Sequence, residues 1–132
     1  AGKNMSPANI EAALKAASPL IGQACVIGDR RPYNVALIVL DPDGTAAFAA
    51  GNDAGDEALG AVAAAEAIVE AVEEGVRRAN ERLSRVEQIK RFRVLEEEWD
   101  PGGDELTPTM KLKRRPIAEK YAEEIEALYA AP

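Results

Sequence analysis

The sequence predicts an α+β fold, in which a three-stranded, mostly antiparallel sheet and its flanking helices form a small sandwich. Strand-length apolar runs at residues 24–27 and 35–40 and an alternating segment at residues 89–95 lie between segments with helical apolar spacing. A length of 132 residues suits a single core. Hydrophobic residues make up 47% of the chain and charged residues 30%, as in ordinary globular domains. No apolar run is long enough to predict a transmembrane helix.

The first third of the chain predicts a helix followed by a hairpin. Ser6 can cap the helix and Pro7 suits its first turn, where no amide donor is needed. One face should be buried, because apolar residues recur there at helical spacing: Ile10, Ala13, Leu14 and Ala17. The polar residues 28–34 separate the two apolar runs that follow, which predicts a β-hairpin with a long loop.

The middle third predicts a turn and two helices. Residues 41–44 read Asp-Pro-Asp-Gly, which is a strong turn signal. Residues 45–60 are rich in alanine, glycine and aspartate, and we expect a short helix and a loop there. A long helix follows, with an apolar stripe whose members are three or four residues apart: Val69, Val72, Val76, Ala79 and Leu83. We interpret this helix as a structural packing element.

The last third predicts a strand, a loop and a terminal helix. Residues 89–95 alternate so that Phe92 and Val94 share a face, as in a half-buried strand. Residues 100–104 are typical of a loop. Pro116 is expected to begin the terminal helix, whose buried face would carry Ile117, Tyr121, Ile125 and Leu128.

Charge and residue usage exclude several classes of function. A net charge of −7 argues against nucleic-acid binding, which needs a basic surface. The chain has no histidine, so the usual general base and every Ser-His or Cys-His pair are absent. Its single cysteine, Cys25, is expected to be a buried small hydrophobe. Any chemistry must therefore use lysine, arginine, carboxylates or the backbone.

A basic cluster follows a Thr-Pro-Thr turn in this acidic chain. The cluster comprises Lys111, Lys113, Arg114 and Arg115, and a predicted helix begins directly after it. Positive charge and free helix-terminal amides together favour an anion. A solvated basic loop is the alternative that charge alone leaves open.

Residues 105–114 resemble the C-terminal signature of adenylate-forming enzymes, which reads P-K-T-x-x-G-K-x-x-R. Thr107, Lys111 and Arg114 fall on its threonine, lysine and arginine, whereas Glu105, Leu106 and Met110 stand at its proline, first lysine and glycine. The departures resemble the version in long-chain acyl-CoA synthetases, L-T-P-T-x-K-x-K-R. Residues 106–114 match that version at every fixed position.

The beginning of the chain supports the same resemblance. Residues 2–11 are similar to the family's hinge-associated motif, G-x-N-[VIM]-S-P-x-x-I-E, and the hairpin strands are similar to the family's hairpin. The chain also lacks an initial methionine. We therefore expect residues 1–132 to be a single C-terminal, mobile, lysine-bearing domain, separated from a large N-terminal adenylation domain.

The resemblance implies a cytoplasmic long-chain fatty acid–CoA ligase, whose contact with a membrane surface stays open. The alanine- and arginine-rich composition is associated with bacteria of high GC content, so we expect a bacterial origin. The same resemblance implies Lys111 as the catalytic residue of acyl-adenylate formation, and Gly2, Lys3 and Asn4 as the loop on the CoA side. ATP, Mg²⁺, CoA and fatty acid would bind the full-length enzyme, and this domain would hold no metal and no tight cofactor. Its partner would be the N-terminal domain of the same enzyme, and we expect no binding to nucleic acid. The domain alone should be inactive.

Several assignments stay open at the level of sequence. Lys113 is expected to be solvated, and Arg114 to form a structural salt bridge within the domain or across the domain interface. Five cations could contact CoA phosphates, and the sequence does not choose among them: Arg30, Arg31, Lys90, Arg91 and Arg93. Tyr33 and Trp99 are expected to be packing residues, with adenine stacking as the alternative. The alternative functions are adenylation of another carboxylic acid, or a stand-alone module that binds an anion or a partner.

Overall fold

The computed structural model describes residues 6–51 and 57–130, and it confirms an α+β fold with a three-stranded sheet. Its elements in chain order are α1 (Pro7–Ala17), β1 (Ile21–Ile27), β2 (Asn34–Leu40), α2 (Pro42–Gly51), α3 (Glu57–Arg82), the 3-10 turn η1 (Arg85–Glu87), β3 (Ile89–Leu95), α4 (Arg114–Lys120) and α5 (Ala122–Ala130). No helix in the described part of the chain is both long and apolar enough to cross a bilayer.

The sheet is mixed, with β2 in the centre. β1 and β2 pair antiparallel, with Cys25 opposite Leu37, whereas β2 and β3 pair parallel, with Ala36 opposite Phe92. The expectation of a mostly antiparallel sheet is therefore corrected for the second pairing. The cause is the long excursion through α2 and α3, because a crossover of that kind returns the chain to the same end of the sheet.

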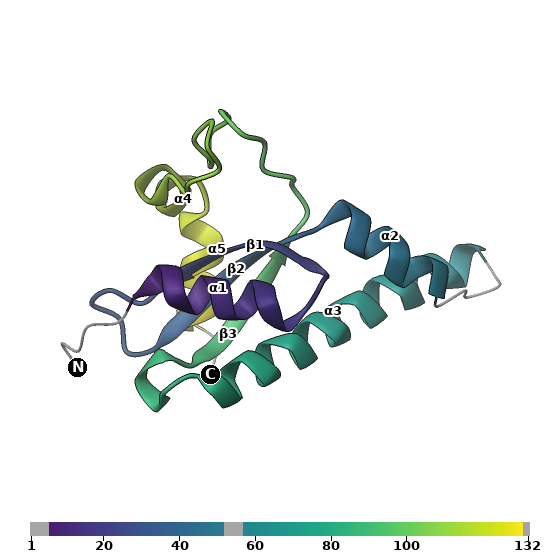
Figure 1. The fold of residues 1–132 in the computed structure, drawn as a ribbon, viewed down its shortest axis with the longest axis horizontal. Coiled ribbons are helices and arrows are strands. Elements are labelled where there is room, and N and C mark those ends of the chain that lie inside the picture. Colours follow the sequence, from purple (N-terminus) through teal and green to yellow (C-terminus); the bar gives the residue numbers. More distant parts are fainter. Residues whose placement is uncertain (1–5, 52–56, 131–132) are drawn as a thin grey trace.

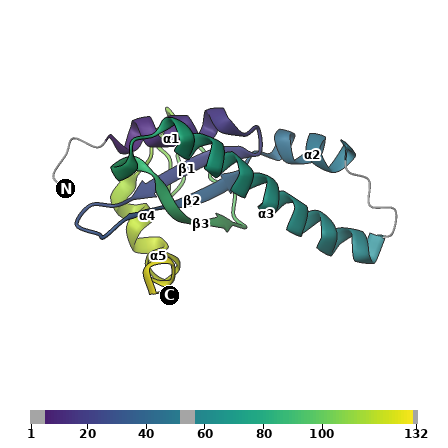
Figure 2. The same cartoon turned by 90° about the horizontal axis from the view of Figure 1, so that it is seen from below.

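Helices cover both faces of the sheet (Figures 1 and 2). On β2, Ala36 and Ile38 belong to a core cluster with α1 and α3, whereas Leu37 and Val39 belong to a second cluster with α4 and α5. This alternation follows from the two-residue period of a strand. The predicted stripe of α3 is buried at Val72, Val76 and Ala79, while Val69 is 46% exposed.

The start of α1 is as predicted, but the start of α2 is not. Ser6 Oγ accepts a hydrogen bond from Asn9 N at 3.3 Å, which caps α1. Residues 41–44 begin a helix and do not form an isolated turn: Asp41 Oδ2 accepts from Gly44 N at 2.7 Å, and Pro42 is the first helical residue. Asp-Pro suits a helix start as well as a turn, so the turn prediction was wrong.

The terminal helix is divided in two. α4 begins at Arg114, two residues before Pro116, and ends at Tyr121, where φ is −106° and ψ is 26°. The predicted buried face is confirmed at Ile117, Tyr121 and Ile125. No glycine or proline accompanies the break, so the sequence contains no signal for it.

Gly44 offers a test of the close contact between α2 and the segment before β1. A Cβ at this position would overlap the carbonyl group of Pro19. Helix propensity alone predicts that Gly44→Ala gains about 1 kcal/mol. We expect instead a loss of about 1–3 kcal/mol in urea unfolding, because backbone must move to accommodate the methyl group. Ala46→Gly, at an exposed position of α2, is the control and should lose no more than about 1 kcal/mol. A stabilised Gly44→Ala chain would contradict this packing.

Cys25 is 3% exposed, which confirms it as a core residue. Burial, followed by the nearby charge of Glu11, raises the pKa of the Cys25 thiol from 9.0 to about 12. We expect the folded chain at pH 8 to react with a thiol reagent at least about a hundredfold more slowly than the urea-unfolded chain. The unfolded thiol ionises first, so stability should fall as the pH rises from about 9 to about 12. Cys25→Ala should show a shallower decline, and an equal slope would contradict the raised pKa.

Candidate functional site

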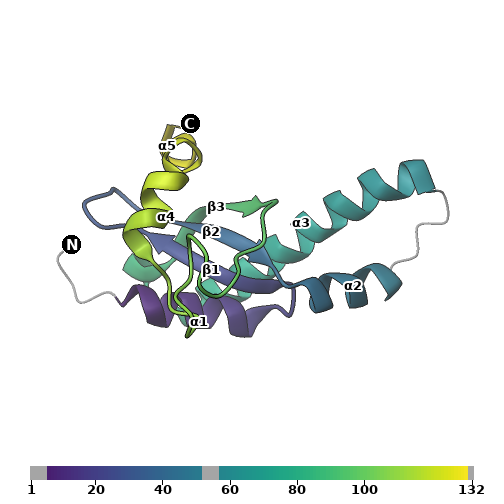
Figure 3. The same ribbon diagram turned by 90° about the horizontal axis from the view of Figure 1, so that it is seen from above.

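Residues 105–113 form a tight hairpin, called here the lysine hairpin. Its arms are joined by Lys113 N donating to Glu105 O at 2.8 Å and Thr107 N donating to Lys111 O at 2.8 Å. Met110 N donates to Thr107 O at 2.9 Å and Met110 has a φ of 70°, which is the pattern of a three-residue loop that ends in a left-handed residue. The segment between β3 and α4 that contains it lies along the outer edge of the molecule (Figures 1 and 3).

Met110 occupies the position at which the general signature has glycine. Its positive φ explains that preference, because only glycine adopts this conformation without strain. The methionine is held there by the hairpin's own bonds, including Lys111 N donating to Thr107 Oγ1 at 3.0 Å. The departure from the signature therefore leaves the hairpin geometry in place.

Lys111 is exposed, and its side chain has no salt-bridge or hydrogen-bond partner among the residues that the structure describes. The neighbouring cations differ: Arg114 pairs with Glu11, Arg115 with Glu119 and Lys120 with Glu105. The Arg115 pair is long, at 3.6 Å, and its side chain is 90% exposed, so Lys111 and Arg115 are the cations in this segment that are available for an anionic ligand.

An ion pair between the buried Glu11 and the partly exposed Arg114 holds the arm of the hairpin that leads into α4. Arg114 donates from both terminal nitrogens to Glu11, at 2.7 and 2.8 Å, and Glu11 Oε2 also accepts from Val26 N at 2.8 Å. The hydrogen bond with Glu11 raises the pKa of Arg114. The predicted structural salt bridge of Arg114 is confirmed, within the domain. The identity of its partner was not predicted, although a glutamate beside the buried Ile10 on α1 requires one.

A second buried glutamate holds the other arm. Glu105 Oε2 accepts from Lys120 Nζ at 2.6 Å and from the Tyr121 hydroxyl at 3.2 Å, and Trp99 Nε1 donates to that hydroxyl at 3.0 Å. The hydrogen bond with Glu105 raises the pKa of Lys120. Sequence analysis noticed Glu105 only as a departure from the signature, because its partners lie on α4 and just after it.

Lys113 is a structural residue and not a solvated charge, which corrects the expectation. Its ammonium donates to the carbonyl oxygen of Gly103 at 2.8 Å and its side chain is half-buried. The bond links the end of the lysine hairpin to the loop at residues 100–104. Lys113 differs from Lys111 because it lies at the base of the hairpin, opposite Glu105 and within reach of Gly103, whereas Lys111 directly follows the loop at the tip.

Two of the cations considered for CoA phosphates are engaged within the domain. Arg31 pairs with Glu126 of α5 and lies over the Tyr129 ring at 4.5 Å, while Arg91 donates to Leu128 O at 3.3 Å. The packing roles predicted for Trp99 and Tyr33 are confirmed. Trp99 is 6% exposed. The Tyr33 ring lies 5.1 Å from the Tyr129 ring.

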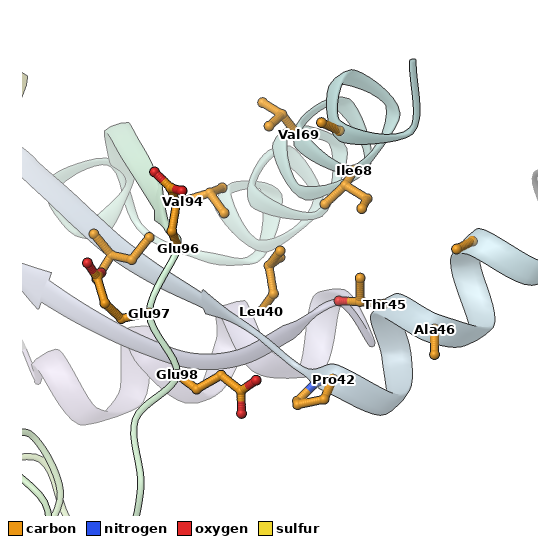
Figure 4. Close-up of a pocket in the computed structure, with 13 residues that line it drawn as sticks. Leu40, Pro42, Thr45, Ala46, Ile68, Val69, Val94, Glu96, Glu97 and Glu98 are labelled. Atoms are coloured by element: carbon orange, nitrogen blue, oxygen red, sulfur yellow. The ribbon is translucent and has the colours of Figure 1, made fainter. Parts of the chain in front are cut away.

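A hollow of about 590 Å³ lies between α2, α3 and the end of β3, far along the fold from the hairpin (Figure 4). Its walls are mainly apolar, and Glu96, Glu97 and Glu98 follow one side. Three carboxylates disfavour an anion such as ATP or a fatty acid carboxylate. The lysine hairpin contributes none of the lining residues, so we assign the anion site to the hairpin and not to this hollow.

Comparisons with known proteins identify the family of this chain. The family described as the AMP-binding enzyme C-terminal domain matches residues 1–132. A putative fatty-acid–CoA ligase of Mycobacterium tuberculosis is 56% identical over 99% of this chain and 23% of its own length. A long-chain-fatty-acid–CoA ligase of the same species is 40% identical over 97% of the chain and 21% of its own length. The chain thus spans less than a quarter of the length of these relatives.

Solved structures show the same fold within larger enzymes. The adenylation domain of a carboxylate reductase from Mycobacterium chelonae superposes with a TM-score of 0.71 at 25% identity, over 96% of this chain and 18% of that one. A didomain of a carboxylic acid reductase from Segniliparus rugosus, in complex with AMP, gives a TM-score of 0.69 at 25% identity, over 96% of this chain and 16% of that one. The resemblance read from the two terminal motifs is confirmed: this chain belongs to the family of C-terminal domains of AMP-binding, adenylate-forming enzymes.

Proposed function

We propose that this chain is the mobile C-terminal domain of a long-chain fatty acid–CoA ligase, and that it supplies Lys111 to ATP-dependent adenylation. The observation that carries the proposal is the exposed ammonium of Lys111, which has no partner among the described residues, whereas Lys113, Arg114 and Lys120 around it are engaged. The names of the bacterial relatives support the substrate class. The remainder of such an enzyme, a large N-terminal domain, would bind the fatty acid and ATP with Mg²⁺.

In the first step, a carboxylate oxygen of the fatty acid attacks the α-phosphorus of ATP and pyrophosphate leaves. Two anions must approach each other, so a cation between them lowers the barrier most in the transition state. Lys111 suits this task because its long side chain carries a compact charge and the hairpin presents it away from the domain.

In the second step, the CoA thiolate attacks the carbonyl carbon of the acyl-adenylate and AMP leaves. The domain would rotate between the steps, withdrawing Lys111 and bringing in the loop of Gly2, Lys3 and Asn4. These three residues lie outside the described part of the chain, so their role stays a prediction. The need for ATP and CoA supports a cytoplasmic location for the enzyme, which stays a proposal.

Adenylation of another carboxylic acid is the second candidate. The superposed carboxylate reductases support it, because their adenylation domains carry the same fold. The acid-binding pocket lies outside this chain, so the match of residues 106–114 to the long-chain version decides our preference. A stand-alone binding module is disfavoured because the relatives are four to five times longer than the part that this chain matches.

The assignment of Lys111 can be tested in the intact ligase that contains this chain. Lys111→Ala should lower single-turnover pyrophosphate release by at least about a hundredfold, because it removes a charge-assisted contact made mainly in the transition state. Supplied acyl-adenylate and CoA should still react at a near wild-type rate. Lys113→Ala is the matched control and should be much milder, since its ammonium is occupied by Gly103 O. If only Lys113→Ala abolishes adenylation, the site assignment is wrong by two residues.

The CoA-side loop can be tested at Gly2. A bulky side chain there should obstruct the path of the pantetheine arm, so Gly2→Leu should keep pyrophosphate release but lose thioester formation from supplied acyl-adenylate. Both half-reactions are measured in the intact ligase, with Gly2→Ala as a smaller change that should lose less. Equal losses in the two half-reactions would show that the loop has another role.

A further inference from the structure

The buried carboxylates of this domain are concentrated at the lysine hairpin. Among residues 6–50 and 65–130, for which side-chain burial is described, the charged side chains that are buried are Glu11, 6% exposed, and Glu105, 5% exposed. Taking a carboxylate out of water is costly unless a cation and further donors satisfy it. Both glutamates are satisfied in this way, and each one contacts a different arm of the same hairpin.

On the first arm, the backbone and the side chain of Glu105 are both engaged. The carbonyl oxygen accepts from Lys113 N at 2.8 Å, which closes the hairpin at its base. The carboxylate is held by Lys120 and Tyr121, at 2.6 and 3.2 Å, and so connects this arm to the junction of α4 and α5.

The second arm ends at Lys113. Arg114 directly follows it and forms two hydrogen bonds with the carboxylate of Glu11. Two parallel N–H···O bonds fix the plane of a guanidinium group as well as its position. Glu11 is itself held by α1 and by Val26 N of β1, at 2.8 Å. A tilt of the hairpin about its base would therefore break contacts on both sides.

We infer that Glu11 and Glu105 are positioning residues for Lys111, an inference that rests on the proposed function. Neither carboxylate contacts Lys111; each acts by holding the base of the hairpin from which the ammonium extends. A displacement of about 1 Å at the reacting centre can cost about a hundredfold in rate, so a base clamped on both arms serves adenylation directly. Both buried glutamates thus serve the orientation of one lysine.

The test is a double-mutant cycle on pyrophosphate release in the intact ligase. Glu11→Gln and Glu105→Gln keep the shape of the side chain and remove the charge, and each should slow adenylation by about tenfold. Each is then combined with Lys111→Ala. If the glutamates act through Lys111, Glu105→Gln/Lys111→Ala and Glu11→Gln/Lys111→Ala should be no slower than Lys111→Ala alone, within about twofold. Glu119→Gln, which removes an exposed pair on α4 with Arg115 at 3.6 Å, should leave the rate unchanged.

A further tenfold fall in the double variants would mean that the glutamates support the enzyme independently of the lysine, and would overturn the inference. Wild-type rates for the single glutamate variants would do the same, provided that Lys111→Ala is slow. A wild-type rate for Lys111→Ala would overturn the proposed function itself, and this inference with it. Thermal unfolding checks that each variant is folded. If a glutamate variant is unfolded, it is replaced by the variant of its partner, Arg114→Lys for Glu11 or Lys120→Arg for Glu105, which keeps the charge. The partner variant should slow adenylation roughly threefold, and it is combined with Lys111→Ala in the same cycle.

Discussion

The ion pair between Glu11 and Arg114 joins three parts of the domain that the chain order keeps apart. Glu11 lies on α1, its second oxygen accepts from Val26 N of β1, and Arg114 begins α4. The pair thereby connects helices that cover opposite faces of the sheet. It also connects the two terminal motifs, since Glu11 ends the hinge-associated motif and Arg114 ends the lysine signature. The orientation of the lysine hairpin relative to the rest of the domain depends on this contact.

Local sequence signals predicted the parts of the fold that depend on nearby residues. The cap of α1, the hairpin strands, β3 and the stripe of α3 follow from capping chemistry and from periods of two and 3.6 residues. The direction of β3 relative to β2 depends on the end of the sheet to which the chain returns after α2 and α3. Apolar periodicity carries no information about that end. The helix at residues 42–51 was read as a turn at its start because Asp-Pro-Asp-Gly fits both structures.

The sequence likewise predicted one part of the candidate site and missed another. Lys111 was found through a resemblance in sequence, and the structure adds that its ammonium is unpaired among the described residues. The glutamates that hold the hairpin were missed because their partners are distant in the sequence. One signal was available for Glu11, since an acid on the buried face of an amphipathic helix requires a partner. Nothing comparable existed for Glu105, whose burial depends on Trp99 and Tyr121.

The span of the Glu11–Arg114 contact has a consequence for the order of folding. Its partners are separated by 103 residues, so closing this contact costs much chain entropy and requires most of the domain to be in place first. The β1–β2 hairpin can form early, whereas β3 must wait for the excursion through α2 and α3. The lysine hairpin is therefore among the last parts to reach its final orientation. A ribosome-bound or truncated chain that lacks α4 can hold much of the sheet, yet it cannot present Lys111 in its clamped position.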